Sequence, residues 1–373
     1  MDISLFPTII YSFMLGITAF ALLETRNKPG QEQTLFLRGL LCLLFIHSLG
    51  ELYLYSGAYI YAPALTIAHL PVRVLLGPAL YFYACATISP EAKQPVRSYL
   101  IALLGPLFIS LAMLPFVLGL SSEEKLALVD PATRNPEHYQ QALFVCVMAM
   151  SVFVLFTASY LFAALRLQKG HRTQLMERFS AIEQRSLDWF RVILILWGVA
   201  WLAYAIEYLL TFVGFSWFGS GVLLPLVEGI ILMAFANQAL KQPILKKSDK
   251  GAPTSIKPRS VLLSEQQMQE IALKLKGAMS QRALFMEEDF SLNRLSNAIA
   301  VSENYISETL SQCLHTNFFQ FVNHYRVEAA KALLKESDKR VSTIAFEVGF
   351  NTKSTFNVAF KKVTGETPTS YRS

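Results

Sequence analysis

The chain has 373 residues, of which 53% are hydrophobic and only 16% are charged. A charged share this far below that of ordinary soluble domains argues against a protein that is surrounded by water along its whole length. The charges are also unevenly placed, because long uncharged runs fill residues 1–240 and almost none follow. The formal net charge of +6 suits either nucleic acid or an anionic membrane surface. The composition therefore predicts two parts, one solvated by lipid and one by water.

Seven segments of the first part are long and apolar enough to cross a bilayer as helices. The hydrocarbon core requires about 20 mostly apolar residues, and the backbone polar groups must be paired within the segment. The first segment lacks a positively charged start and a small-residue cleavage site, so we predict a membrane helix there and not a signal peptide. The predicted spans are residues 5–23, 35–56, 62–88, 99–119, 142–165, 190–212 and 215–237, with the last turn at Val213-Gly214.

Lysine and arginine are concentrated in alternate loops of this part. The first, third and fifth loops carry nine of them, and the even-numbered loops carry two. Cytoplasmic loops of membrane proteins carry such an excess, so we predict a bacterial inner-membrane protein with its N-terminus outside and its C-terminal part in the cytoplasm. The nine are Arg26, Lys28, Lys93, Arg97, Arg166, Lys169, Arg172, Arg178 and Arg185, and the two are Lys125 and Arg134.

Several ionisable residues lie inside the predicted spans, where they are costly and seldom without function. The second and third spans each carry a pair spaced four residues apart, which places each pair on one face of its helix. We predict an outward-facing polar pocket that senses a ligand or pH, with Arg73 as its anion anchor. The alternative is a set of structural ion pairs between helices. The predicted pocket residues are His47, Glu51, His69, Arg73 and Glu207; Glu228 lies in the seventh span.

A basic linker is predicted at residues 238–262, where several prolines and glycines interrupt helical structure. Its cations could bind anionic lipid at roughly 1 kcal/mol each. They could equally follow the usual excess of positive charge beside a last membrane helix. The basic residues are Lys241, Lys246, Lys247, Lys250, Lys257 and Arg259, opposed only by Asp249.

Residues 263–373 show helical periodicity throughout. Ser264 and Gln267 form a capping box that opens a helix reaching about Ser280. Two similar helix-turn-helix units follow, at about residues 291–314 and 342–364. In such units the second helix of each pair enters the major groove of DNA. The predicted caps are Ser291 and Ser302 in the first unit and Ser342 in the second, with turns at Ala300-Val301 and Gly349.

One longer helix is predicted between the two units, over residues 317–334. Its apolar residues recur at helical spacing, and its length is about 27 Å at a rise of 1.5 Å per residue. That length is close to the turn of B-DNA of roughly 34 Å that separates two reading heads on one face of the duplex. A rigid spacer of this size lets both units address successive major grooves.

Residues 289–372 resemble the AraC/XylS family of regulators, on motifs that are specific in their order and spacing. The resemblance implies a DNA-binding domain with two helix-turn-helix units. With the apolar helices before it, the chain is similar to the membrane-anchored branch of that family, which carries a seven-helix sensory module. The matching positions are Ser302-x-x-Tyr305-Ile306-Ser307, Tyr325-Arg326-Val327-Glu328-Ala329-Ala330, Ile344-Ala345-Phe346-Glu347-Val348-Gly349-Phe350, Ser354, Phe356, Phe360-Lys361-Lys362, Gly365, Thr367-Pro368 and Tyr371-Arg372, with a looser match at His69-Leu70-Pro71 and Gly77-Pro78-Ala79-Leu80-Tyr81-Phe82-Tyr83.

The chain departs from the family pattern at four positions. Leu310 stands where the family often has Phe, and His315 where it usually has Gly. Two recognition-helix positions that are commonly Arg are Glu308 and Val358. Two Lys/Arg against five Asp/Glu make residues 281–316 net −3, whereas nine against five make residues 317–373 net +4. We therefore expect the second unit to hold phosphates more strongly.

The residues expected to face DNA follow from their positions in the two recognition helices. Asn pairs with adenine, Lys with guanine and Glu with the amino group of cytosine, whereas other cations position the phosphates. The predicted DNA-binding residues are Asn304, Ser307, Glu308 and Ser311 in the first unit and Thr352, Lys353, Ser354, Asn357, Lys361 and Lys362 in the second.

These features predict an all-α protein with a seven-transmembrane sensory domain at residues 1–237, the linker, and an AraC-type DNA-binding domain at 263–373. The predicted function is transcription regulation, in which a signal sensed in the membrane controls sequence-specific promoter binding. The expected partners are double-stranded promoter DNA, the lipid bilayer, an unidentified small-molecule or pH signal, a second copy of the chain, and RNA polymerase.

A second class of function stays open, a membrane receptor or transporter-like protein whose C-terminal part binds another protein. Glu308, Val358 and the acidic first unit favour it slightly. An enzyme is not expected, because the chain contains no phosphate-binding loop, no nucleophile motif and no His/Cys set at metal-binding spacing. We accordingly predict no catalytic residue, no cofactor, no zinc site and no disulfide framework among Cys42, Cys85, Cys146 and Cys313.

Overall fold

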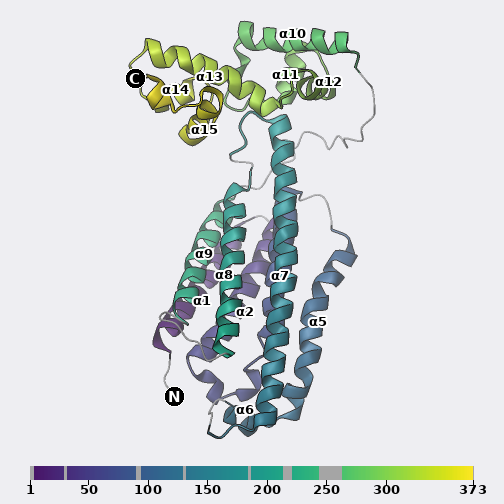
Figure 1. The fold of residues 1–373 in the computed structure, drawn as a ribbon, viewed down its shortest axis with the longest axis vertical. Helices are drawn as coiled ribbons and strands as arrows, with labels where there is room; N and C mark the ends of the chain where they lie inside the picture. Colours follow the sequence, from purple (N-terminus) through teal and green to yellow (C-terminus); the bar gives the residue numbers. More distant parts are fainter. Residues whose placement is uncertain are drawn as a thin grey trace. The chain divides into compact units, whose positions relative to one another are not determined.

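The computed structural model describes residues 4–28, 32–89, 94–128, 132–183, 186–212, 221–242 and 263–372 (Figure 1). Helices joined by turns and short loops make up these residues, and their only extended pairing is an isolated bridge between Phe179 and Ser291. The predicted all-α class is confirmed for them. Contacts divide the chain into two compact units. The N-terminal unit contains Met1–Gln168 and Asp188–Ile244, and the C-terminal unit contains Lys169–Leu187 and Leu245–Ser373.

The N-terminal unit is built from apolar helices. In pairs, α1 packs on α2 and α9, α2 on α4, α3 on α5, and α8 on α9. Its helices are α1 (Leu5–Thr25), α2 (Glu32–Tyr55), η1 (Ala58–Ile60), η2 (Pro63–Leu65), α3 (Leu70–Val74), α4 (Leu76–Ile88), α5 (Val96–Gly119), α6 (Ser122–Ala127), α7 (Pro136–Arg178), α8 (Asp188–Phe212) and α9 (Leu223–Lys241).

Seven helical segments in the described residues have the length and composition needed to cross a membrane. They correspond in order to the seven predicted spans. The last of them begins at Leu223 instead of residue 215, and the predicted turn at Val213-Gly214 lies outside the described residues. Residues 243–262, most of the predicted linker, also lie outside them.

The third predicted span is not one continuous helix. It consists of η2, a stretch of turns at residues 66–69, and then α3 and α4, which meet at Leu75. Proline explains the restart, because Pro71 lies in the first turn of α3, where its missing N–H leaves no helical hydrogen bond unmade. The prediction of a single helix over 62–88 was therefore wrong, and the break places His69 immediately before α3.

Helix α7 is much longer than predicted. It runs from Pro136 to Arg178, whereas the apolar pattern predicted residues 142–165. The additional C-terminal residues are rich in Leu, Arg, Gln, Lys, Met and Glu, all good helix formers that sustain a helix without a lipid environment. The helix crosses from one unit into the other at Gln168–Lys169, so α7 is covalently part of both.

Aromatic rings fill the interior of the N-terminal unit. The rings of Tyr83 and Phe190 meet at 5.4 Å between centroids, and those of Trp197 and Phe235 at 5.3 Å. These four side chains are fully buried. They come from α4, α8 and α9, so the cluster packs these three helices against one another.

The C-terminal unit contains two small hydrophobic cores that share α13. The first core is formed with α10, α11 and α12, and the second with α14 and α15. Its elements are α10 (Glu265–Arg282), η4 (Leu284–Met286), α11 (Leu292–Ile299), α12 (Glu303–Glu308), the π-helical turn η5 (Thr309–Cys313), α13 (Phe318–Glu336), α14 (Val341–Glu347), α15 (Lys353–Thr364) and α16 (Pro368–Arg372).

Most predicted helix starts in this unit are confirmed. The Ser264–Gln267 capping box is formed, and the hydroxyls of Ser291 and Ser302 accept hydrogen bonds from the third backbone N–H of their helices. The prediction for Ser342 was wrong: α14 begins at Val341, two residues earlier than predicted, and Arg340 occupies the cap position without a side-chain bond. Lys339 and Arg340 have no cap-forming side chain, so packing of Ile344 and Ala345 in the second core sets this start.

The backbone conformation of His315 shows why glycine is favoured at this position. Its φ is +49°, in the left-handed region, immediately after the π-helical turn that ends the first helix-turn-helix unit. Glycine adopts this conformation without steric cost, which accounts for its usual presence there. His315 therefore adopts a backbone conformation that glycine accommodates more easily.

Candidate nucleic-acid interface and polar pocket

The first helix-turn-helix unit is formed by α11 and by α12 with η5. Ala300 ends α11 in the left-handed conformation, and Val301 N–H then donates to Ser296 O at 3.2 Å. Leu295 and Ile306 are fully buried and hold the two helices together. Of the four predicted DNA-facing residues, Asn304 and Ser311 are exposed, and Ser307 and Glu308 are partly exposed. The four side chains are accessible, and their contact with DNA stays a prediction.

The second unit is formed by α14 and α15. Gly349 makes the turn at φ +94°, and Thr352 caps α15 by accepting from the N–H of Thr355 at 3.1 Å. Phe356 and Phe360 fix the buried face of α15 in the second core. The opposite face carries exposed Lys353, Ser354, Lys361 and Lys362, with Thr352 and Asn357 partly exposed.

Val358, a recognition-helix position that was not among the predicted DNA-binding residues, lies on the same exposed face. It lies four residues after Ser354 and three before Lys361, and 68% of its surface is exposed. An apolar side chain in the major groove can pack on the methyl group of thymine. Helical spacing alone could have placed it with the others.

The spacing element α13 is 19 residues long, so it spans about 28 Å. Asn317 caps it by accepting from the N–H of Gln320 at 2.9 Å. One face of α13 contributes Phe318 and Val322 to the first core, and further along it contributes Val327 and Leu334 to the second. A single helix thus carries both units.

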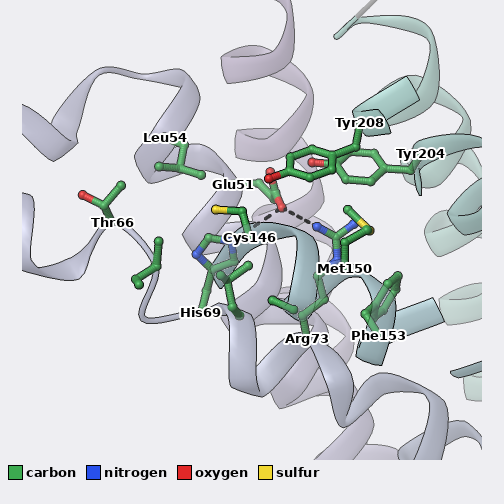
Figure 2. Close-up of a pocket in the computed structure, with 13 residues that line it drawn as sticks. Glu51, Leu54, Thr66, His69, Arg73, Cys146, Met150, Phe153, Tyr204 and Tyr208 are labelled. Atoms are coloured by element: carbon green, nitrogen blue, oxygen red, sulfur yellow. Dashed lines mark hydrogen bonds and ion pairs between the residues drawn. The ribbon is translucent and has the colours of Figure 1, made fainter. Parts of the chain in front are cut away.

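The N-terminal unit contains a cavity of about 210 Å³ lined by Glu51, His69 and Arg73 (Figure 2). Figure 2 shows Glu51 between the other two side chains, with Tyr204 and Tyr208 alongside. Oε1 of Glu51 accepts from Nη1 of Arg73 at 3.2 Å and lies 3.7 Å from Nε2 of His69. Three of the five predicted pocket residues therefore share one cavity, although they come from different helices.

The other two predicted pocket residues do not line this cavity. His47 lies 4.0 Å from Glu51, and its Nε2 lies 3.3 Å from Oε1 of Glu228. Glu228 also accepts from the indole N–H of Trp201 at 3.3 Å. His47 thus contacts the same Glu51 carboxylate without lining the cavity. Glu207 lies elsewhere, where its carboxylate accepts from the backbone N–H of Gly221 at 2.8 Å.

Arg73 is held by rings as well as by Glu51. Its guanidinium carbon lies 4.7 Å from the ring centre of Phe153 and 4.3 Å from that of Tyr204. Arg73 is only 5% exposed, and its Nε has no hydrogen-bond partner among the described residues. Two aromatic faces stabilise a desolvated guanidinium while leaving one N–H available, which suits contact with an anion or a polar ligand group.

Gly50 makes the close approach at this site possible. A Cβ at this position would lie 2.5 Å from Cβ and Cγ of His69. The absent side chain therefore lets the residue before α3 pack directly on α2, next to Glu51. The aromatic residues Tyr204 and Tyr208, from α8, complete the wall, and no local sequence pattern had singled them out.

The C-terminal unit, with two helix-turn-helix units on one connecting helix, has the architecture of a DNA-binding domain. Residues 295–373 match the family described as "Helix-turn-helix domain". The chain thus carries an AraC-type helix-turn-helix domain at its C-terminal end, as the resemblance implied.

Three similar proteins each match about a quarter of this chain. An uncharacterized HTH-type transcriptional regulator of Staphylococcus aureus is 36% identical over 89 residues, which are 24% of this chain and 12% of that protein. YtdP of Bacillus subtilis (strain 168), an uncharacterized HTH-type transcriptional regulator, is 30% identical over 86 residues, or 23% of this chain and 11% of YtdP. The solved C-terminal domain of AraT, a response regulator from Geobacillus stearothermophilus, is 31% identical, with 26% of this chain and 83% of that domain covered and a TM-score of 0.24.

Proposed function

We propose that this protein is a membrane-embedded transcription regulator that couples a signal sensed in its N-terminal unit to sequence-specific binding of promoter DNA. The observation that carries the DNA-binding part is the presence of two helix-turn-helix units whose predicted groove-facing side chains are all accessible. Relatives that match about a quarter of the chain are described as transcriptional regulators.

The apolar surface of the N-terminal unit supports membrane embedding. Only between 22% and 44% of the residues in each candidate span are buried inside the unit. Among the remainder, Leu118, Leu155 and Phe162 are at least 67% exposed. Large apolar side chains exposed along whole helices are costly in water and favourable in lipid.

The proposed orientation has structural support at one end of the N-terminal unit. Nζ of Lys28, in the first loop, donates to the carbonyl of Ala239 near the end of α9 at 3.2 Å. The first loop and the C-terminal end of α9 therefore lie on the same side of the helices. That side is the cytoplasm in our proposal, because it carries the basic loops and leads to the DNA-binding domain.

The second copy of the chain and RNA polymerase remain proposed partners. The first helix-turn-helix unit carries more acidic than basic residues, so one chain offers few phosphate contacts. Two tethered domains on one promoter would multiply these contacts, since the second binding event becomes intramolecular.

The DNA-binding proposal is tested with the full chain in lipid nanodiscs and a random-sequence DNA library. We expect enrichment of a bipartite site. The double substitution Lys361→Ala/Lys362→Ala should weaken binding to that site at least about tenfold and lower the slope of log K against log salt by about 2, because two phosphate-positioning cations are lost. Affinities measured across a salt series give both values.

The matched control is Lys274→Ala/Lys276→Ala, which removes two exposed lysines from α10, outside both helix-turn-helix units. It should leave affinity and salt slope near those of the unmodified chain. If no sequence is enriched even at low salt, the DNA-binding proposal fails and the protein-interaction alternative is favoured.

For the sensing part, we propose that the cavity around Arg73 receives the signal, either an anionic or polar small molecule or a proton. Both His47 and His69 lie within 4.0 Å of Oε1 of Glu51, which also bonds Arg73, so several ionisable groups gather at one carboxylate. In cells carrying a reporter behind the enriched site, output should depend on external pH or on the added compound. Arg73→Ala should abolish that dependence, whereas Glu207→Gln, whose carboxylate lies outside the cavity, should retain it. A well-expressed Arg73→Ala protein with an unchanged response would disprove the sensory pocket.

A further inference from the structure

Arg326 of α13 is fully buried in the C-terminal unit and binds several backbone carbonyls. Its Nε donates to Phe285 O at 2.7 Å, and its Nη2 donates to Glu287 O at 2.8 Å. Both carbonyls belong to the segment between α10 and α11. Burial lowers the pKa of Arg326 to about 10, so the side chain is still charged near neutral pH and its hydrogen bonds are charge-assisted. These two carbonyls accept from Nε and Nη2 of the guanidinium, and Nη1 bonds other partners.

Nη1 of Arg326 also donates to Oδ1 of Asn323 on α13 itself, at 3.5 Å. Two further acceptors come from the segment that follows α7, 146 residues away in the chain. Ser180 O accepts from Nη1 of Arg326 at 3.4 Å, and Ser180 Oγ accepts from Nη2 at 3.1 Å. Ser180 also donates to Phe290 O, from its N–H at 3.1 Å and from its hydroxyl at 2.7 Å. Phe179 forms its bridge with Ser291, the cap of α11. Residues 179–182, which we name the α7 tail, are thus fixed by side-chain and backbone bonds.

The α7 tail binds at the place where the two helix-turn-helix units meet. The guanidinium carbon of Arg326 lies 5.5 Å from the ring centre of Phe350, in the turn of the second unit. A Cβ on neighbouring Gly349 would lie 2.8 Å from Phe285 O, one of the acceptors of Arg326. Ser180, Ala181 and Ile182 are themselves buried. The α7 tail therefore contacts the start of the first unit and shares Arg326 with the second.

We propose that the α7 tail is the coupling element of the protein, an internal ligand of the Arg326 site that carries the position of α7 to the junction between the two helix-turn-helix units. A buried guanidinium retains its geometry only while its donors are satisfied, so displacement of Ser180 loosens this junction. Docking of the tail is independent of the proposed function. Its coupling role rests on the proposed binding of DNA.

Docking is tested in the full chain in native membranes by disulfide formation between Phe179→Cys and Ser291→Cys, in a background without the four native cysteines. Opposed residues of an antiparallel pair have Cα atoms about 4.5–5.5 Å apart, within the roughly 4.4–6.8 Å that a disulfide spans. We expect this pair to cross-link rapidly. The control pair Thr173→Cys/Ser291→Cys, which begins in α7 itself, should not. Equal rates for the two pairs would overturn the docking.

Coupling is tested on the full chain in nanodiscs with the bipartite DNA site. Ser180→Ala removes the hydroxyl that bonds Arg326 and Phe290, so it should weaken binding to the bipartite site by about 5-fold or more while leaving binding to a single half-site unchanged. Ser180→Thr, which keeps the hydroxyl, should restore affinity. Thr173→Ala, which removes an exposed hydroxyl from α7, should have no effect.

Reciprocity supplies a second measurement, since DNA must affect the α7 tail as much as the tail affects DNA. Bound DNA should slow hydrogen exchange of the Ser180 amide by the same factor. Unchanged affinity of Ser180→Ala together with unchanged exchange would overturn the coupling. If the unmodified chain binds no DNA while the disulfide still forms, the proposed function and the coupling role fail, and the docking stands.

Discussion

Replacing Arg326 by methionine should lower the local unfolding free energy of the C-terminal unit by about 3 kcal/mol or more. The substitution leaves Phe285 O, Glu287 O and Ser180 Oγ without their donor, and a buried polar group without a partner costs about 1–3 kcal/mol. Native-state hydrogen exchange of α13 in the full chain measures this value directly, because it reports one unit without requiring the whole chain to unfold in a single step.

Two further substitutions on α13 make the Arg326 prediction specific. Arg326→Lys keeps the charge but not the planar five-donor group, so it should recover less than half of the loss. Lys331→Met breaks a partly exposed ion pair with Glu328 at 2.7 Å and should cost at most about 0.5 kcal/mol. Equal effects of Arg326→Met and Lys331→Met would show that the buried guanidinium does not hold the unit together.

Gly349→Ala should destabilise the second helix-turn-helix unit by about 3 kcal/mol. The left-handed backbone at φ +94° costs an alanine about 1–2 kcal/mol, and forcing atoms into a packed region adds about 1–3 kcal/mol. The added Cβ would lie 2.7 Å from Met286 O and 2.8 Å from Phe285 O, both backbone atoms that cannot simply rotate away. Exchange rates of the amides in α14 and α15 provide the measurement.

Gly365→Ala is the matched control for Gly349→Ala. Gly365 is also left-handed, at φ +87°, but no atom of the described residues lies within 4 Å of the position that its Cβ would take. It should therefore show only the conformational cost of about 1–2 kcal/mol. The prediction is contradicted if the two substitutions cost the same. Combined with Arg326→Met, Gly349→Ala should be non-additive, because both act on Phe285 O.

Interactions within a few residues were predictable from the sequence alone. Hydrophobic runs identified seven helical segments in the right order among the described residues, since each run of about 20 apolar residues lies within one continuous stretch of chain. The caps Ser264, Ser291 and Ser302 act on the third residue that follows, so their pattern is visible in the sequence. The turn at Gly349 was predictable for the same reason, because its conformation depends on the residue itself.

What the tertiary structure decided involves residues far apart in the chain. His47 was predictable as a polar residue in a long apolar helix, but its partner Glu228 is 181 residues away, and only packing of α2 near α9 brings them together. Likewise, Glu207 shares the composition of the predicted pocket residues but bonds Gly221 instead. Spacing along one helix shows which residues share a face and does not show which other helix that face meets.

Arg326 illustrates the same division. By itself the sequence determined that this arginine lies on a helix between two helix-turn-helix units, from local periodicity and the family motif. It did not show that the guanidinium is buried and bound to Ser180, because a pattern of apolar residues carries no information on the partner of a buried charge. Only the folded chain, in which α7 extends to Arg178 and leads directly to Ser180, determines that contact.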